Sequence, residues 1–272
     1  MHYREADDEY FEIVAAEMVG LFAKPGTTEF PSTYRAFAGF CAKTNSLKTA
    51  LFDMVDSNNP YAFNALFRCF CEHYLKFTYI WVRFCSEKTD VAGSDYFDFC
   101  GASEARDYVA ALQAAEKLVG DFVGGDAEKA IASMYPATVG MSQKEIEAKA
   151  GQFKYRSILR FLRTAAPEMV STQTPFLVSI VPEYATLSSF VHGGPYTDMD
   201  MGTYSQPEAL KECEERAGLA FMMAASVFMM SAAAVAREHP QHLSIAPRVL
   251  EIINRFIEAE DEEPPTQEEA PA

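Results

Sequence analysis

The sequence predicts an all-α protein, a multi-helix bundle, on three observations. Apolar residues recur at helical spacing along most of the chain, and alternating patterns of the kind that indicate strands are nearly absent. The 272 residues are 49% hydrophobic and 13% aromatic, which is enough apolar side chain to fill a core. Proline and glycine separate the periodic segments, as expected where one helix ends and the next begins.

Clear stop and start signals bound the first three predicted helices. Pro25-Gly26 ends the first helix, and Ser32 can cap the second. A polar loop separates the second helix from the third, which Pro60 opens at a position where its missing N–H costs nothing. These helices are predicted to span residues 5–24, 32–55 and 60–86.

In the middle of the chain the predicted helices are mostly shorter and are separated by more loops. A loop containing Gly93 and Gly101 is expected first, followed by a helix that Ser103 caps. Shorter periodic stretches come next, on both sides of Pro136 and up to a loop around Pro167. The predicted helices in this part span residues 104–123, 127–133, 142–151 and 153–164.

The last third of the chain begins with the short apolar run 176–181, which could form a strand. Pro182 is expected to open a helix directly after it, and Gly193 ends that helix. A long helix follows, and Pro240 separates it from the last one. The predicted helices span residues 182–192, 207–238 and 247–260.

We therefore expect one helical domain over residues 1–257 and a disordered acidic tail over residues 258–272. The tail has seven acidic residues, no basic residue and three prolines. Such a composition is typical of a solubilising end, and the alternative is an interaction motif.

Charge and cysteine content narrow the class of protein. The net charge of −16 argues against broad, non-specific binding of nucleic acid, because the overall field repels phosphates. The six cysteines lie among apolar residues and no signal peptide precedes them, which predicts reduced thiols in a cytoplasmic protein. No cysteine or histidine spacing completes a zinc set, so neither a metal nor another cofactor is expected.

Residues 217–236 are a run of twenty without a charge, long enough to cross a membrane. Eight of them are alanine and four are methionine, a content that contributes little to membrane insertion. A central bundle helix needs the same small and flexible side chains, so we interpret the run as a buried helix.

A first stripe of polar side chains lies on the otherwise apolar helix 60–86. Arg68, Glu72 and Lys76 recur every four residues, and Tyr79 and Arg83 continue the line. Charges on a buried helix require an explanation. An internal ion pair between Arg68 and Glu72 is one, and a functional site is the other.

A second stripe is formed by Tyr184, Ser188 and His192, at positions i, i+4 and i+8 of the helix opened by Pro182. His192 is expected at the helix C-terminus, where the dipole favours its protonated form. The alternative is a core histidine bonded to a neighbour. A Ser188–His192 nucleophile pair is disfavoured, because no strand-to-helix elbow and no acidic partner for the histidine are evident.

Metal-independent RNA cleavage needs an acid or base and a cation that stabilises charge on the phosphate. His192 and Arg68 could supply these two roles if their helices face each other. Arg156, Arg160 and Arg163 form a third line and could hold the RNA backbone; a solvated helix face is the alternative.

The two stripes resemble a group of uncharacterised bacterial helical proteins with an Arg-x3-Glu helix and a downstream Tyr-x2-Leu-Ser-x2-Val-His element. The matching residues lie within 60–86 and 182–194, about one-sixth of the chain. More distantly, that group is similar to HEPN-like bundles of prokaryotic toxin and antiviral defence systems. In those bundles an Arg-x4-6-His motif cuts RNA at a dimer interface. Here two spans match that motif, Arg68 to His73 and Arg237 to His242, and the second gives an alternative catalytic pair.

The resemblance implies a cytoplasmic, homodimeric, HEPN-like bundle with additional helices that acts as a ribonuclease in defence or toxin function. In this hypothesis Arg68 and His192 act on the phosphate, while Glu72, Tyr184 and Ser188 orient them. A second hypothesis is a non-enzymatic interaction or regulatory subunit of a defence complex, whose acidic surface or tail binds a basic protein. A membrane effector that uses residues 217–236 is the third.

Overall fold

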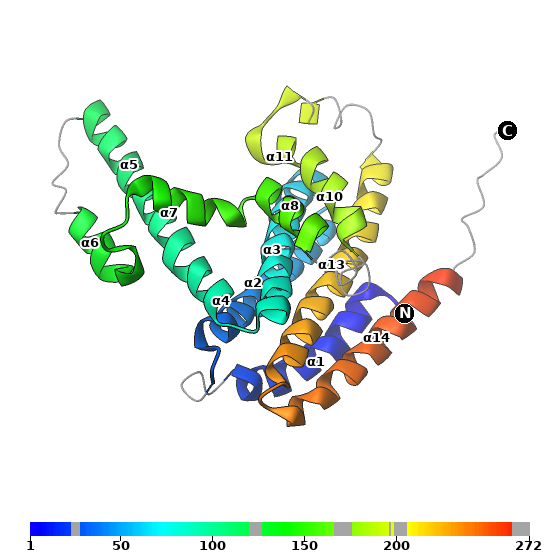
Figure 1. The fold of residues 1–272 in the computed structure, drawn as a ribbon. Coiled ribbons are helices and arrows are strands. Elements are labelled where there is room, and N and C mark those ends of the chain that lie inside the picture. Colours follow the sequence, from blue (N-terminus) through cyan, green and yellow to red (C-terminus); the bar gives the residue numbers. More distant parts are fainter. Residues whose placement is uncertain (23–27, 120–126, 166–175, 196, 199–205, 263–272) are drawn as a thin grey trace. The chain divides into compact units, whose positions relative to one another are not determined.

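A computed structural model describes residues 1–22, 28–119, 127–165, 176–195, 197–198 and 206–262 (Figure 1). All regular structure in these ranges is helical and none of it is strand, which confirms the predicted all-α class. The α-helices are α1 (Tyr3–Phe22), α2 (Pro31–Asp56), α3 (Pro60–Glu87), α4 (Val91–Asp95), α5 (Gly101–Val119), α6 (Ala127–Met134), α7 (Gln143–Ala150), α8 (Tyr155–Ala165), α10 (Leu177–Thr186), α11 (Ser188–His192), α13 (Gln206–Val235) and α14 (Ile245–Glu262). A π-helix (Tyr96–Cys100) and 3-10 turns at Pro136–Thr138, Gly151–Phe153 and Pro240–Ser244 join some of them.

The chain divides into two compact units. Unit 1 comprises Met1–Ala23, Cys41–Cys71 and Ile180–Ala272, and unit 2 comprises Lys24–Phe40 and Glu72–Ser179. The sequence analysis expected a single helical domain over 1–257. Three of the boundaries between the units fall inside α2, α3 and α10, where the helical pattern of the sequence is continuous.

In unit 1, the helices α1, α13 and α14 pack against one another along their lengths (Figure 1). The Tyr10 ring of α1 meets the rings of Phe221 and Phe228 of α13 edge-on, at centroid distances of 5.9 and 6.1 Å. Its hydroxyl donates to the carbonyl oxygen of Ala224 at 3.3 Å. Phe256 of α14 also packs edge-on against Phe221, at a centroid distance of 5.5 Å. Alanine on α13 leaves room for these large rings, which explains why its central segment is both small and apolar.

The helix α13 is long and apolar enough to cross a membrane, judged by length and composition alone. In the structure, however, 78% of its most apolar window is buried inside the protein. The expected core packing of residues 217–236 is therefore what this structure shows, and the length criterion is met equally by a core helix.

A buried ion pair joins α1 to α2 within unit 1. The ammonium group of Lys48, whose side chain is 1% exposed, pairs with the Asp7 carboxylate and donates to Asn45 Oδ1 at 2.8 Å. Burial raises the pKa of Asp7 and lowers the pKa of Lys48, while the attraction between the two charges opposes both shifts. Each charge therefore depends on the other to remain in the interior.

In unit 2, residues 91–119 form one helical path, where the sequence predicted a loop around Gly93 and Gly101. The expected Ser103 cap is also wrong, because the backbone is already helical at Asp95 and Gly101. The two glycines permit close packing. A Cβ on Gly93 would lie 2.3 Å from Thr33 N, and one on Gly101 would lie 2.5 Å from the Tyr135 ring.

The start of α2 is capped from a distant part of unit 2. Asp90, next to α4, accepts hydrogen bonds from the backbone N–H groups of Ser32 and Thr33, at 3.0 and 2.7 Å. A carboxylate at this position satisfies N–H groups that have no partner within the helix and also complements the helix dipole. Ser32 therefore lies inside the helix, and Asp90 supplies the cap that the sequence assigned to Ser32.

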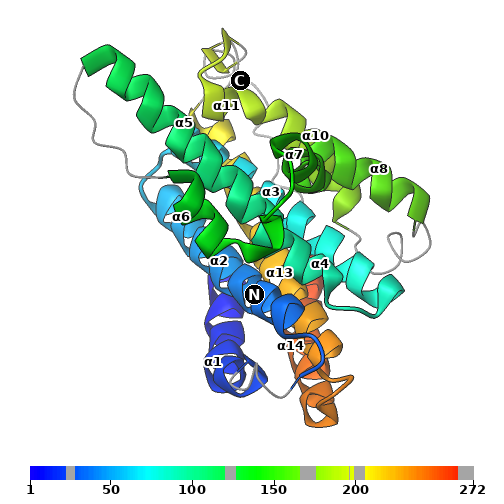
Figure 2. The ribbon, with the colours of Figure 1, turned by 60° about the vertical axis from the view of Figure 1, so that its left-hand side comes forward.

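Other helices of unit 2 surround a second core. Figure 2 shows α6 and α7 beside α5. Phe99, Ala102, Ile131, Ile146 and Ala150 form the buried cluster between them. Ser142 begins α7 with a capping box, in which Ser142 and Glu145 satisfy each other's backbone N–H groups. The start of this helix is therefore set by local sequence, in agreement with the prediction.

The predicted boundaries near residue 182 are wrong. The helix α10 begins at Leu177, so residues 177–181 are helical and Pro182 lies inside the helix. Proline has no N–H to donate to the carbonyl of Val178, a residue that is itself exposed. A turn at Leu187 then separates α10 from α11. At the other end, α14 continues to Glu262, five residues into the predicted tail, and 263–272 lie outside the described residues.

Substitution of Gly93 by alanine is expected to destabilise unit 2 by about 1–3 kcal/mol, because its methyl group would overlap the backbone of Thr33. Gly39→Ala is the matched control: a Cβ at this α2 position meets nothing within 4 Å, so it should be neutral or stabilise by about 0.5–1 kcal/mol. Urea unfolding followed by circular dichroism measures both. Equal midpoints for the two variants would contradict the close-packing role of Gly93.

Asp7→Asn is expected to lower the unfolding free energy by about 3–5 kcal/mol at neutral pH, because it leaves the buried Lys48 ammonium group without its counter-charge. Lys48→Met should also destabilise, and the double variant should lose less than the sum of the two single losses. Asp53→Asn, at an exposed site of unit 1, should change stability by less than about 0.5 kcal/mol. Strict additivity would show that the two groups do not interact.

Candidate functional site

A cluster of paired polar side chains joins three helices of unit 1, and we call it the arginine cluster. Asn64 and Arg68 lie one turn apart on the same face of α3, and Arg216 projects from α13. The members of the arginine cluster are Asn64, Arg68, Glu183, Tyr184, Glu212 and Arg216.

Arg68 and Tyr184, both candidates from the sequence, are in contact. The Arg68 Nη2 donates to the Tyr184 hydroxyl at 2.6 Å, and the guanidinium carbon lies 3.5 Å from the centroid of the tyrosine ring. The Arg68 side chain is buried, with 8% of its surface exposed. A guanidinium group stacked on a ring and bonded to its hydroxyl is held by both charge and shape.

Arg216 is the second cation of the cluster. Its Nη2 pairs with Glu183 of α10 and with Glu212 of its own helix, each at 2.8 Å, and its Nη1 donates to Asn64 Oδ1 at 3.0 Å. Glu183 directly precedes Tyr184 on α10, so this helix supplies one bonding partner to Arg216 and one to Arg68. With two arginines and two glutamates, the formal charges of the cluster balance.

Cys71 lies one turn beyond Arg68 on α3 and is fully buried. Burial raises the pKa of its thiol to about 12; the Glu183 carboxylate adds to this shift, while Arg68 and Arg216 oppose it. Because nucleophilic attack requires the thiolate, Cys71 is a protonated core residue at neutral pH. Cys41 is similar, with a pKa raised to about 12 by burial, and all six cysteines are free.

The other predicted members of the site are Glu72, Ser188 and His192. Glu72 lies one turn after Arg68 on α3 and pairs with Lys76, a further turn along the same helix, at 2.8 Å. Ser188 and His192 are the first and last residues of the short helix α11, and a turn at Leu187 lies between this helix and Tyr184. Ser188 is half-buried and His192 is exposed, next to Gly193 in the left-handed conformation.

The neighbouring Ser189, which the sequence analysis did not select, organises this turn. Its hydroxyl donates to the carbonyl oxygen of Gly194 at 3.1 Å and lies 3.0 Å from the buried Thr197 hydroxyl. A Cβ on Gly194 would lie 2.6 Å from the Ser189 Oγ, so a side chain at this position would require the Ser189 hydroxyl to move.

The alternative pair Arg237 and His242 lies beyond the end of α13. Arg237 is exposed, whereas His242 is nearly buried in the 3-10 turn Pro240–Ser244. The His242 ring approaches the His239 ring at 6.3 Å, and its Nε2 lies 3.4 Å from Gln241 Nε2. The other literal match, His73 of unit 2, contacts the Phe40 ring at 6.3 Å.

The basic line on α8 is a solvent-exposed face of unit 2. Arg156, Arg160 and Arg163 are all exposed, and Lys154 just before the helix adds a fourth exposed cation. The opposite side of the helix is buried through Ile158 and Leu162. This face is accessible to solvent and to an anionic partner.

Within the described ranges, no group of three or more histidine, cysteine, aspartate or glutamate side chains is placed to hold a metal ion. Sequence reasoning missed four members of the arginine cluster, Asn64, Glu183, Glu212 and Arg216. One signal was available, because Glu212 and Arg216 form an i, i+4 pair at the charged start of an otherwise apolar helix. No sequence pattern indicated that this pair meets Glu183.

Comparison of the chain with protein-family models, with curated proteins and with solved structures found no significant match.

Arg216→Met is expected to destabilise the protein by about 1–3 kcal/mol, because it leaves Glu183 and Asn64 without their partner in a largely buried position. Glu212→Gln removes only the more exposed partner and should cost less than about 1 kcal/mol. Tyr184→Phe removes the acceptor for Arg68 and should cost about 1–2 kcal/mol. Chemical unfolding ranks the three. A loss for Glu212→Gln as large as that for Arg216→Met would refute this assignment of roles.

Proposed function

We propose that this protein is a non-enzymatic interaction or regulatory subunit that binds a basic partner protein through the acidic surface of unit 1. The proposal rests mainly on the uneven distribution of charge. Unit 1 contains 24 of the 39 acidic residues and 9 of the 23 basic ones, whereas unit 2 contains 15 and 14. Nearly all of the net charge of −16 therefore belongs to unit 1.

A charge of this size steers oppositely charged partners during association. The pairing within the arginine cluster adds support, because its guanidinium groups are engaged with carboxylates and a phenol in a largely buried position. A phosphate would have to displace these partners to reach Arg216. The resemblance to HEPN-like proteins suggests a defence or toxin complex as the setting of such a subunit.

Affinity purification of the tagged protein from its native cells, at low and at high salt, tests the proposal. We expect one stoichiometric partner with a basic surface, retained at low salt and released as the salt concentration rises, because screening weakens exposed charge pairs. The purified complex should not degrade RNA. Purification of the protein without a partner, together with RNA cleavage that Arg68→Met abolishes, would refute the proposal.

A HEPN-like, metal-independent ribonuclease acting as a homodimer is the second candidate, and the exposed basic face of α8 favours it. Arg156, Arg160 and Arg163 are spaced along one helix face and are open to solvent. Cations arranged in this way can follow a nucleic-acid backbone. The contact between Arg68 and Tyr184 would then supply a positioned cation for the phosphate, with His192 or the pair Arg237 and His242 in acid–base roles.

RNA binding measured over a series of salt concentrations tests this second candidate. If α8 holds RNA, replacing Arg156, Arg160 and Arg163 by glutamine should weaken binding. The slope of the logarithm of the binding constant against the logarithm of the salt concentration should also become shallower, by the amount expected for about three lost phosphate contacts. Glutamine at Lys88, Lys117 and Lys144, three other exposed cations of unit 2, is the matched control and should have little effect. Equal losses for the two sets would show that α8 has no special role.

A further inference from the structure

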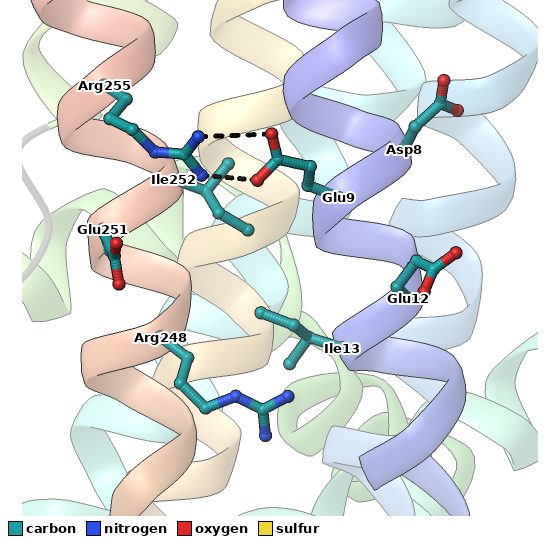
Figure 3. Close-up of a pocket in the computed structure, with 8 residues that line it drawn as sticks. All are labelled: Asp8, Glu9, Glu12, Ile13, Arg248, Glu251, Ile252 and Arg255. Atoms are coloured by element: carbon teal, nitrogen blue, oxygen red, sulfur yellow. Dashed lines mark hydrogen bonds and ion pairs between the residues drawn. The ribbon is translucent and has the colours of Figure 1, made fainter.

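An open groove of about 510 Å³ lies between α1 and α14 in unit 1 (Figure 3). Its floor is formed by Ile13 of α1 and Ile252 of α14, whose side chains lie between the two helices. The position of the groove is determined by the packing of these helices against α13. It lies apart from the residues of the arginine cluster, which come from α3, α10 and α13.

Two ion pairs cross from one helix to the other along the groove. Arg255 of α14 pairs with Glu9 of α1 at 2.5 Å, and Arg248 pairs with Glu17 at 2.7 Å. The hydrogen bond from Arg255 lowers the pKa of Glu9, so this carboxylate stays charged at neutral pH. Both arginines of the groove are therefore engaged with carboxylates of α1.

The remaining charges of the groove are carboxylates on its two edges. Asp8 and Glu12 stand one turn apart on the outer side of α1, and Glu251 stands on the outer side of α14 (Figure 3). All three are exposed, and none makes a hydrogen bond or ion pair with another described residue. The groove thus combines a narrow apolar floor with unpaired negative charge on both sides.

This combination matches the chemistry of a lysine or arginine side chain. Such a side chain has an aliphatic stem that can cover an apolar surface and a charged end that remains at its edge. A stem lying over Ile13 and Ile252 would place its cation beside Glu12 or Glu251. Two basic residues one turn apart on a helix would likewise match the one-turn spacing of Asp8 and Glu12.

We propose that the α1/α14 groove is the docking site for a lysine- or arginine-rich segment of a partner protein. The inference rests on the proposed function and gives that function a location and a partner chemistry. Steering by the field of unit 1 brings the segment to the surface, and the groove selects basic side chains by pairing their charged ends with Asp8, Glu12 and Glu251. Because these pairs are exposed, binding should weaken as salt is added.

Fluorescence anisotropy with the full chain and a labelled helical peptide of alanine and lysine tests the site. The groove variant carries Asp8→Asn, Glu12→Gln and Glu251→Gln. The matched control carries Asp53→Asn, Glu214→Gln and Glu215→Gln, which neutralise three exposed carboxylates elsewhere in unit 1. The two triple variants have the same net charge. Circular dichroism checks that both remain folded.

We expect the groove variant to bind the peptide at least about tenfold more weakly than the wild type, and the control to stay within about threefold. A peptide with glutamate in place of lysine should not bind. Equally weakened peptide binding in the two variants would overturn the assignment of the docking site to the groove. It would not contradict the proposed binding of a basic partner by the acidic surface of unit 1. Absence of binding by the wild type would overturn the docking proposal. The proposed function has its own test in the partner that co-purifies with the protein.

Discussion

Buried charge is the constraint on which both units depend. A cation removed from water must find an acceptor, because an unpaired charge in the interior costs several kcal/mol. Lys48 meets Asp7, Arg216 meets Glu183, and the nearly buried Arg83 of unit 2 meets Glu87 and Asp95. Each of these pairs joins different helices or successive turns, so it restricts how the helices pack as well as neutralising charge.

Charged side chains that are paired inside the protein hold its helices together, whereas exposed ones are available to a partner. In the arginine cluster, hydrogen bonds and ion pairs run between residues of different helices, which is the arrangement expected of a network that holds α3, α10 and α13 together. Exposed charge remains on the edges of the α1/α14 groove, where it is negative, and on α8, where it is positive. The two functions proposed for this protein rest on these two exposed faces.

Glycine and proline explain most differences between the predicted and the observed helices. Gly93 and Gly101 suggested a loop, yet they lie in helices and permit contacts that any Cβ would prevent. Pro182 suggested a helix start and lies within α10. A glycine that provides space and one that breaks a helix look the same in a single sequence, because the neighbour that requires the space comes from a distant segment. Ser142 was assigned correctly because its capping partner, Glu145, is local.

The sequence by itself determined the helical class, most helix positions, the buried α13 and the exposed basic line of α8, since all of these follow from the periodicity and composition of contiguous residues. It also selected Arg68 and Tyr184, because each is a polar group on an apolar helix. Only the tertiary structure decided that these two residues meet and that Arg216 and Glu183 complete the cluster. The reason is that the partner of a charged side chain is set by which helices pack together, and the spacing along one helix does not contain that information.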